Sequence, residues 1–545
     1  MFLKFREQVI RALGEYGDEK YIRESEHADL CSTIAFKLAK EQKRKPSEIA
    51  DEIVENISIG EYIGSVQSVN GYINFFVSYE FLEDTIRVIL DMDERYGFLN
   101  LKGEVLIEHT SANPDGPLHI GHIRNSIIGD TLARIMRKAG LKVKTQYYVN
   151  DMGRQIALAV LGYKLFGVDR SKKEDHAVVE AYIKANKLVE EEKREDLVRE
   201  VDELMMKYEQ GDEEVSKLFR ELVEMALVGI KKTLRRLNVE HDEFVWESEF
   251  VRNGYVNRVL NELDRIGLIK KDGAWILELD DKDVVLKREN GTTLYITRDL
   301  AYHLWKSENY KRFINVLGAD HKLYANQLNK ILKILKLKTP EVVFFEFVSL
   351  PEGSMSTRKG KFISADELIE KVKEEAEKII ADRDFSDDEK RRIAECVAIG
   401  ALRYDFIKIA PEKPMVFDWK KALDFERQTA NYIQYSHARA CSILRKVSGR
   451  RDFKAELCDE VERRLVVLLS KFPYYVLRVV NELKPNVFAE YLMSVAMTFN
   501  DFYRDHSVLR AEEEIREHRI AIVDATRIVL RNGLELLGIE PLERM

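Results

Sequence analysis

Long apolar runs are missing from this 545-residue sequence. No stretch approaches the roughly 18 uninterrupted apolar residues that a membrane-spanning helix needs. The first residues, MFLKFREQVIRALGEYGDEK, mix charged with apolar side chains and contain no apolar core of a secretory signal. The sequence therefore argues against a membrane-embedded protein, and without an export signal a cytoplasmic location is expected.

Cysteine is scarce as well. The cysteines are scattered along the chain, and no two of them form a Cys-x-x-Cys pair: Cys31, Cys396, Cys441 and Cys458. This argues against a zinc site built on paired cysteines and against a disulfide framework. We expect free thiols in a reducing compartment and no resident metal ion.

A surplus of basic residues is also lacking, because 87 Lys and Arg stand against 95 Asp and Glu, for a net charge of −8. This total does not exclude a nucleic-acid partner, since binding depends on local basic patches. Low-complexity segments and internal repeats are absent too. With 45% apolar and 33% charged residues, the chain can bury several cores, in roughly three to five domains of about 100–200 residues each.

The hydrophobic pattern divides the chain into three parts. Residues 1–98 combine helical periodicity with a strand-like segment at Gly71–Val77, which predicts an N-terminal α/β domain. Residues 99–385 alternate strand and helix patterns, with a charged helical insertion at about 165–285. Residues 386–545 are almost wholly helical and predict an all-α domain.

The central part begins with a βαβ pattern. Val105–Glu108 and Val143–Val149 are predicted strands, and apolar residues from Ile123 to Met136 recur at helical spacing between them. Further strands are predicted at Leu294–Thr297, Phe313–Leu317 and Val342–Val348. This alternation predicts an α/β fold with a Rossmann-like parallel sheet.

The loop after the first strand ends in His119-Ile-Gly-His122, which opens the following helix. A helix N-terminus offers unpaired N–H groups and the positive end of the helix dipole, which suits phosphate. The two histidines are three residues apart, so they face the same side and can donate to phosphate oxygens. Gly121 leaves room for adenine against the backbone. We predict a nucleotide site; a histidine-bearing helix cap without a ligand is the alternative.

A basic segment, Gly353–Lys361, follows the last predicted strand. Its cations lie next to glycines and can neutralise the pyrophosphate that leaves a triphosphate. Taken alone, such a segment is more often a solvated loop. Ser364-Ala-Asp-Glu367 behind it has the pattern of a capping box and predicts the start of a helix.

These motifs carry a resemblance to a known family. SANPDGPLHIGHIRNSIIGD at 111–130, followed by YYVNDMGRQ at 147–155, resembles the first half of class I arginyl-tRNA synthetases. The resemblance implies an enzyme that activates L-arginine with ATP and Mg²⁺ to arginyl-adenylate and pyrophosphate, and then transfers arginine to the 3′ end of tRNA(Arg). Another class I aminoacyl-tRNA synthetase or a non-catalytic tRNA-binding relative is the alternative.

The resemblance also implies the ATP site. Gly353–Lys361 is similar to the family's KMSKS segment, but Ser354 and Thr357 replace its lysines, and Gly116 stands where some members carry a substitute lysine. Catalysis would fall to His119 and His122, with Arg358 or Lys359 as the replacement cation. The residues expected to bind ATP are His119, Gly121, His122, Gly318, Asp320, His321, Met355 and Ser356.

A guanidinium ligand needs carboxylates, because its planar donors match their oxygens in a fork that lysine cannot reproduce. By resemblance, the residues that bind arginine are Glu108, Asn113, Tyr295, Asp299, His321 and Glu247. Taken singly, Asp299 could instead be a helix N-cap, Glu108 a surface carboxylate and Tyr295 a core residue.

The C-terminal part resembles the family's anticodon-binding domain at ANYIQYSHAR, 430–439, and at LLGIEPLERM, 536–545. Helices with aromatic and basic groups can stack and pair the bases of an unstacked loop. We predict tRNA contacts at Tyr432, Gln434, Arg439 and Met545; a solvated charged helix is the alternative. The N-terminal part is similar to the family's additional tRNA-binding domain, and a monomer is expected.

Overall fold

The computed structural model describes residues 1–279, 283–351, 363–424, 428–447 and 451–545. The chain forms two compact units, which we describe separately. One contains residues 101–423, and the other combines residues 1–100 with residues 424–545.

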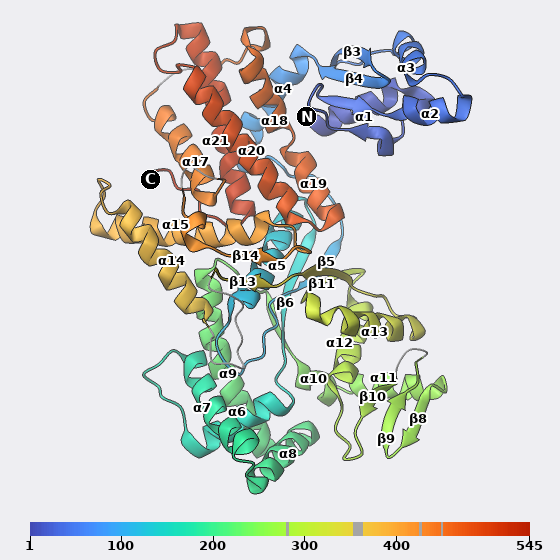
Figure 1. Ribbon diagram of the computed structural model, residues 1–545, viewed down its shortest axis with the longest axis vertical. Helices are drawn as coiled ribbons and strands as arrows, with labels where there is room; N and C mark the ends of the chain where they lie inside the picture. Colours follow the sequence, from blue (N-terminus) through green and yellow to red (C-terminus); the bar gives the residue numbers. More distant parts are fainter. Residues whose placement is uncertain (280–282, 352–362, 425–427, 448–450) are drawn as a thin grey trace. The chain divides into compact units, whose positions relative to one another are not determined.

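A five-stranded sheet is the centre of the first unit (Figure 1). The strands follow the order β12-β11-β5-β6-β7, and all neighbours are parallel. Their bounds are β5 (Glu104–Glu108), β6 (Lys142–Val149), β7 (Glu243–Trp246), β11 (Arg312–Gly318) and β12 (Glu341–Phe345). The predicted α/β fold with a parallel sheet is confirmed.

The strand order reverses at the middle of this sheet. Helix α5 (Ile120–Lys138) connects β5 to β6 on one side, whereas η5 (Ala319–His321) and α13 (Lys322–Ile334) connect β11 to β12 on the other. In open α/β sheets, ligands bind at the carboxyl ends of the strands where the order reverses. Glu108 ends β5 at this place and lies in register with Asn315 of β11.

The chain leaves the sheet twice before β11, in the two green segments of Figure 1. The first excursion contains α6 (Arg154–Phe166), α7 (Glu174–Asn186), the π-turn η4 (Lys187–Glu191), α8 (Glu195–Gln210) and α9 (Glu213–Arg236). The second contains α10 (Glu247–Arg252), α11 (Tyr255–Arg265), the antiparallel strands β8 (Ile269–Asp272), β9 (Ala274–Leu277) and β10 (Val284–Lys287), and α12 (Tyr295–Asn309). Strand β7 of the parallel sheet therefore divides the insertion that we expected at about 165–285.

The strand predicted at Leu294–Thr297 is wrong, because helix α12 begins at Tyr295. Leu294 is the extended residue in front of the helix, and Ile296, Leu300 and Ala301 are buried on one helical face. An apolar run of only a few residues does not distinguish a strand from a helix. Asp299 therefore lies inside α12 and is not its N-cap.

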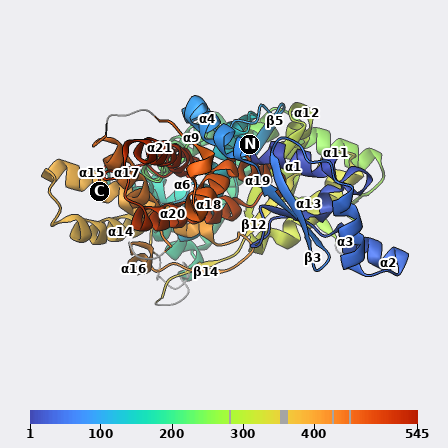
Figure 2. The same cartoon turned by 90° about the horizontal axis from the view of Figure 1, so that it is seen from above.

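Three further helices complete this unit. They are α14 (Ala365–Ile380), α15 (Asp387–Lys408) and α16 (Trp419–Ala422). The short strands β13 (Val348–Ser349) and β14 (Met415–Val416) precede α14 and α16 and pair with each other in parallel. Helices α14 and α15 lie side by side in Figures 1 and 2 and pack together. The predicted capping box at the start of α14 is confirmed, since the Glu367 N–H donates to Ser364 Oγ at 3.2 Å and the Ser364 N–H donates to Glu367 Oε2 at 2.8 Å.

The second unit contains an antiparallel sheet with helices and a helical part. Residues 1–100 form α1 (Phe2–Ala12), η1 (Gly14–Tyr16), η2 (Glu19–Tyr21), β1 (Ile22–Arg23), β2 (Leu30–Ser32), α2 (Ile34–Gln42), α3 (Pro46–Glu55), β3 (Ile63–Val69), β4 (Tyr72–Val77), α4 (Tyr79–Met92) and η3 (Asp93–Arg95), with strand order β1-β2-β4-β3. Residues 424–545 form α17 (Ala430–Leu444), η7 (Ala455–Leu457), α18 (Glu460–Ser470), α19 (Phe472–Glu482), α20 (Pro485–Asp505) and α21 (Glu513–Leu536). Both predicted architectures, α/β and all-α, are confirmed. Within the described part of the chain, no helix combines the length and apolarity that crossing a bilayer requires.

Candidate active site

The turn that follows β5 is strained and firmly held. Thr110 has φ +69° and Ser111 has φ +41°, and a β-branched residue adopts such a conformation only where its surroundings impose it. The Thr110 N–H donates to Asn125 Oδ1 at 2.7 Å, and Tyr148 N–H donates to Ser111 Oγ at 3.0 Å. Helix α5 and strand β6 thus fix the path of the chain between Glu108 and the histidine motif.

The two histidines form a stacked pair at the N-terminus of α5. Their ring centroids are 3.6 Å apart. His119 Nδ1 accepts the Gly121 N–H at 3.1 Å, and His122 Nδ1 accepts the His119 N–H at 3.3 Å. Burial lowers the pKa of both rings, and that of His122 falls well below its ordinary value. Each ring is therefore neutral near pH 7, with its proton on Nε2, where it can be donated.

The chain contacts the histidine motif again at Ser364 and Ala365, at the start of α14. Ser364 forms an isolated antiparallel bridge with His119, and the Ala365 N–H donates to the Leu118 carbonyl at 2.7 Å. Of the residues predicted here, Met355, Ser356, Arg358 and Lys359 lie outside the described part of the chain. Gly116 has no room for the lysine that some family members carry, because a Cβ there would lie 2.9 Å from Val179 Cβ.

A buried arginine that we did not predict supports the same region. Arg124, two residues after His122, is fully buried and donates to the carbonyl of Glu346 at 2.6 Å, of Lys413 at 3.0 Å and of Ala410 at 3.2 Å. Burial lowers the pKa of Arg124 to about 10, so it stays charged at neutral pH. The only signal in the sequence is its place immediately behind the histidine motif.

Among the predicted carboxylates, Asp299 is the one that forms no ion pair with a described residue. Tyr324 donates its hydroxyl to Asp299 Oδ2, and among the described residues no Lys, Arg or His side chain forms an ion pair with this carboxylate. Burial raises the pKa of Asp299 to about 7, and the charges of Glu108 and Glu247 raise it further, against the lowering effects of the Tyr324 hydroxyl and of the Lys306 charge. The same effects show that the three carboxylates lie within electrostatic range of one another.

The other two carboxylates already have cationic partners. Glu108 is buried and pairs with Lys306, which also donates to Asn315 Oδ1 at 3.0 Å. Glu247 is buried and accepts from Arg298 Nε at 2.7 Å. Neither carboxylate is a surface group, so that alternative for Glu108 is wrong. Sequence reasoning missed Arg298, Lys306 and Tyr324; Arg298 lies one residue before Asp299 on α12, and Lys306 lies seven residues after it.

Two further aromatic rings lie close to Tyr324, the hydrogen-bond partner of Asp299. Tyr295 is 61% exposed, which contradicts a core position, and its ring lies 5.2 Å from that of Tyr324. His321 lies 6.4 Å from the Tyr324 ring and 3.8 Å from Asp320. Gly318 precedes this turn, and a Cβ at Gly318 would lie 2.4 Å from Asp320 Oδ1.

Asn113 lies on the strained turn itself. It is exposed and donates to Gln155 Oε1 at 2.7 Å. This hydrogen bond connects the loop after Glu108 to α6.

The residues predicted to contact tRNA belong to the second unit. Arg439 of α17 lies over the rings of Tyr435 and Tyr503, at 4.8 and 4.4 Å, and forms a hydrogen bond with Asn500. Gln434 is fully buried and donates to the Glu540 carbonyl at 2.9 Å, so in this structure it supports the C-terminal segment. Tyr432 and Met545 are half-buried.

Comparisons with known proteins agree over the whole chain. The families described as "tRNA synthetases class I (R), catalytic domain", "DALR anticodon binding domain" and "Arginyl tRNA synthetase N terminal domain" match residues 85–419, 433–545 and 5–77. The arginine–tRNA ligase of Archaeoglobus fulgidus is 72% identical, with 100% of both chains covered. That of Methanosarcina barkeri is 48% identical, with 97% of this chain and 95% of the relative covered.

Solved structures give the same result for the fold. Thermus thermophilus arginyl-tRNA synthetase superposes with a TM-score of 0.87 at 28% identity, over 100% of both chains. The Plasmodium falciparum enzyme superposes with a TM-score of 0.82 at 19% identity, over 99% of both chains. At this identity the likeness shows a shared fold and nothing more. Matches of this extent and identity establish that the chain belongs to the arginyl-tRNA synthetase family of class I.

Proposed function

We propose that the chain activates L-arginine with ATP and transfers the arginine to the 3′ end of tRNA(Arg). The observation that carries the choice of amino acid is Asp299, a sheltered carboxylate without a cationic partner among the described residues. Its neighbours Glu108 and Glu247 are neutralised by Lys306 and Arg298. A cation that enters this place gains Asp299 as its partner, and a planar guanidinium can engage both oxygens.

In the first step, an oxygen of the arginine carboxylate attacks the α-phosphate of ATP, and pyrophosphate leaves. No protein nucleophile is needed, so catalysis consists of positioning and charge stabilisation. His119 and His122 would donate from Nε2 to phosphate oxygens as negative charge increases on them. As neutral donors they need no proton transfer, which matches their lowered pKa values.

Two further charges belong to this step. Mg²⁺ would enter as part of the MgATP substrate, bound through the phosphates. Arg358 or Lys359, outside the described residues, would neutralise the departing pyrophosphate in place of the family's lysines.

The remaining site residues follow from family resemblance and from their places around Asp299. Asn113 would hold the backbone end of arginine, and Tyr295 would cover the side chain. Gly318, Asp320 and His321 would line the ribose side of ATP, with Gly121 beside the adenine. A side chain at position 121 would narrow that space, since its Cβ would already lie 3.0 Å from His119 Cε1.

In the second step, a ribose hydroxyl of the terminal tRNA adenosine attacks the activated carbonyl, and AMP leaves. Residues 386–545 would act as the anticodon-binding domain, residues 1–98 as an additional tRNA-binding domain and residues 99–385 as the catalytic domain. Arg439, with Tyr432 and the chain end at Met545, would contact the tRNA, and Gln434 would support that surface from inside. The protein would act as a monomer in the cytoplasm.

Arginine-dependent exchange of pyrophosphate into ATP, with and without tRNA(Arg), tests this proposal. Arginine should support exchange, whereas lysine and the uncharged analogue citrulline should not, because neither offers a planar cation. Exchange that is supported better by another amino acid would favour a different class I synthetase. Exchange and aminoacylation that are both absent in every condition would favour a non-catalytic tRNA-binding relative.

A further inference from the structure

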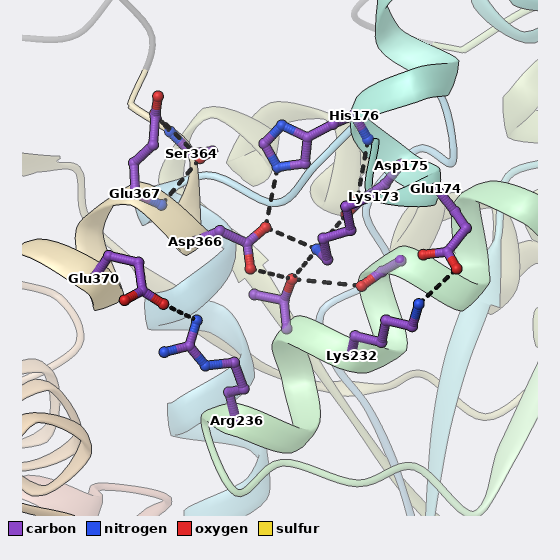
Figure 3. Close-up of polar contacts among 12 residues, drawn as sticks. Lys173, Glu174, Asp175, His176, Lys232, Arg236, Ser364, Asp366, Glu367 and Glu370 are labelled. Atoms are coloured by element: carbon purple, nitrogen blue, oxygen red, sulfur yellow. Dashed lines mark hydrogen bonds and ion pairs between the residues drawn. The ribbon is translucent and has the colours of Figure 1, made fainter. Parts of the chain in front are cut away.

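A polar cluster behind the nucleotide site links the first excursion to α14 (Figure 3). Asp366, in the first turn of α14, accepts hydrogen bonds from three side chains. Its Oδ2 accepts from Lys173 Nζ at 2.7 Å and from His176 Nε2 at 3.1 Å, and its Oδ1 accepts from Thr233 Oγ1 at 3.0 Å. Lys173 and His176 stand at the start of α7, and Thr233 is near the end of α9. One carboxylate thus joins three helices.

The ammonium of Lys173 binds two carboxylates that could otherwise hold a metal ion. Asp175, His176 and Asp366 offer ligand atoms within 4.8 Å of one another. Lys173 Nζ, however, donates to Asp175 Oδ2 at 2.9 Å, to Thr233 Oγ1 at 2.6 Å and to Asp366 Oδ2 at 2.7 Å. An ammonium has three donors, so all of them are used. Lys173 is therefore the cation that faces the carboxylates of Asp175 and Asp366.

The charges in the cluster are fixed by these contacts. Burial alone would raise the pKa of Asp366, but hydrogen bonds from His176 and Lys173 lower it to about 2. The hydrogen bond to Asp366 raises the pKa of His176. Asp175 is the other acidic residue that faces Lys173 and His176. It is fully buried against Gly229, and a Cβ on Gly229 would lie 2.5 Å from Asp175 Cγ. Asp366 is therefore ionised near neutral pH.

The first turn of α14 reaches the nucleotide site directly. Ser364, which caps α14, bridges His119, and the Ala365 N–H donates to the Leu118 carbonyl at 2.7 Å. Helix α7 also contacts the loop that precedes this motif, because a Cβ on Gly116 would lie 2.9 Å from Val179 Cβ. Helix α7 therefore contacts both the loop that leads to His119 and, through Lys173 and His176, the first turn of α14.

We propose that Asp366 is a positioning residue for the nucleotide site. By fixing the first turn of α14 to α7 and α9, it sets the pairing of Ser364 with His119 and so the orientation in which His119 meets ATP. Asp366 acts through Ser364 and touches no substrate. The role of His119 toward ATP rests on the function proposed above.

A neighbouring ion pair provides a matched control. Arg236 of α9 pairs with Glu370 of α14 at 2.7 Å, one helical turn beyond Asp366, and with Glu395 of α15 at 2.9 Å; neither described ion pair involves a residue of the cluster (Figure 3). Glu370→Gln weakens the docking of the same two helices without touching the first turn. Thr233→Val removes one donor to Asp366 from the α9 side and changes no charge.

The experiment compares the wild-type chain with Asp366→Ala, Asp366→Asn, Thr233→Val and Glu370→Gln. The Kd of MgATP is measured by calorimetry, and KM for ATP and for arginine by pyrophosphate exchange. Asp366→Ala should raise the Kd and KM for ATP about five- to tenfold and leave KM for arginine within about twofold. Asp366→Asn keeps an acceptor, so it and Thr233→Val should raise the same constants less. Glu370→Gln should change neither.

Equal rises in KM for ATP and arginine, or the same rise in Glu370→Gln, would overturn the proposal in favour of general destabilisation. ATP constants unchanged in all Asp366 and Thr233 variants would overturn it too. If Asp366→Ala does not fold, Asp366→Asn and Thr233→Val decide. Failure of the proposed function looks different: the wild-type chain itself would show no arginine-dependent exchange, while the Kd of MgATP would still respond to the variants.

Discussion

Replacement of Asp299 with asparagine should make the folded protein more stable while it removes the use of arginine. The pKa of Asp299 is raised from 3.8 to about 7. Each pKa unit corresponds to about 1.36 kcal/mol, so keeping this carboxylate ionised in the empty site costs on the order of 4 kcal/mol. Asparagine has the shape of the protonated carboxyl group and can still accept from the Tyr324 hydroxyl, so it avoids this cost.

Because the pKa of Asp299 is raised in the folded state, the stability difference between Asp299→Asn and the wild type depends on pH. Below about pH 4, Asp299 is protonated in both the folded and the unfolded state, and the variant gains nothing. Between about pH 4 and 7 the folded state holds the proton more tightly, so the stability of the wild type falls relative to the variant as pH rises. Above about pH 7 the gain is constant at on the order of 4 kcal/mol.

Urea unfolding of both proteins from pH 4.5 to 8.5, without arginine, measures this difference. Asp264→Asn is the control, because Asp264 is an exposed carboxylate paired with Lys271 at 2.7 Å and should change stability by less than about 0.5 kcal/mol. The reasoning is refuted if Asp299→Asn is no more stable than the wild type at pH 8, or if its gain does not depend on pH.

Three further predictions follow from the site. Lys306→Met leaves the buried Glu108 carboxylate without its partner and should destabilise the protein by about 3–5 kcal/mol, measured by thermal unfolding, whereas Lys271→Met on the surface should not. His122→Ala removes a donor that acts on the developing charge, so kcat for pyrophosphate exchange should fall about 10²–10³-fold with a smaller change in KM for ATP; an effect on KM alone would contradict that role. Replacing both Arg358 and Lys359 with alanine should lower kcat for exchange at least about tenfold, and unchanged kcat would remove both from catalysis.

Much of the framework was predictable because it depends on short-range patterns. Strands β5 and β6, the histidine motif between them and the capping box at Ser364 all follow from local spacing of residue types. The start of α12 was not predictable in this way, since Leu294–Thr297 fits either a strand or a helix until its packing is known.

The electrostatics of the site could not be derived from the chain alone. Glu108, Glu247 and Asp299 were expected as a set of ligands, but two of them are neutralised by Lys306 and Arg298. Those pairs join α12 to β5 and to the start of α10, which are far apart in sequence. Only the folded arrangement shows that, of these three carboxylates, Asp299 is the one without an ion pair among the described residues, and that Lys173 reaches Asp366 across 193 residues.

The affinity of the wild-type protein for arginine between pH 6 and 8.5, measured by calorimetry, tests most directly whether the Asp299 carboxylate receives the guanidinium. With a pKa of about 7 in the empty site, binding should weaken about tenfold at pH 6 relative to its plateau above pH 8. Asp299→Asn should bind arginine weakly at every pH. Wild-type affinity that is the same at pH 6 and pH 8, or that survives in Asp299→Asn, would contradict the account.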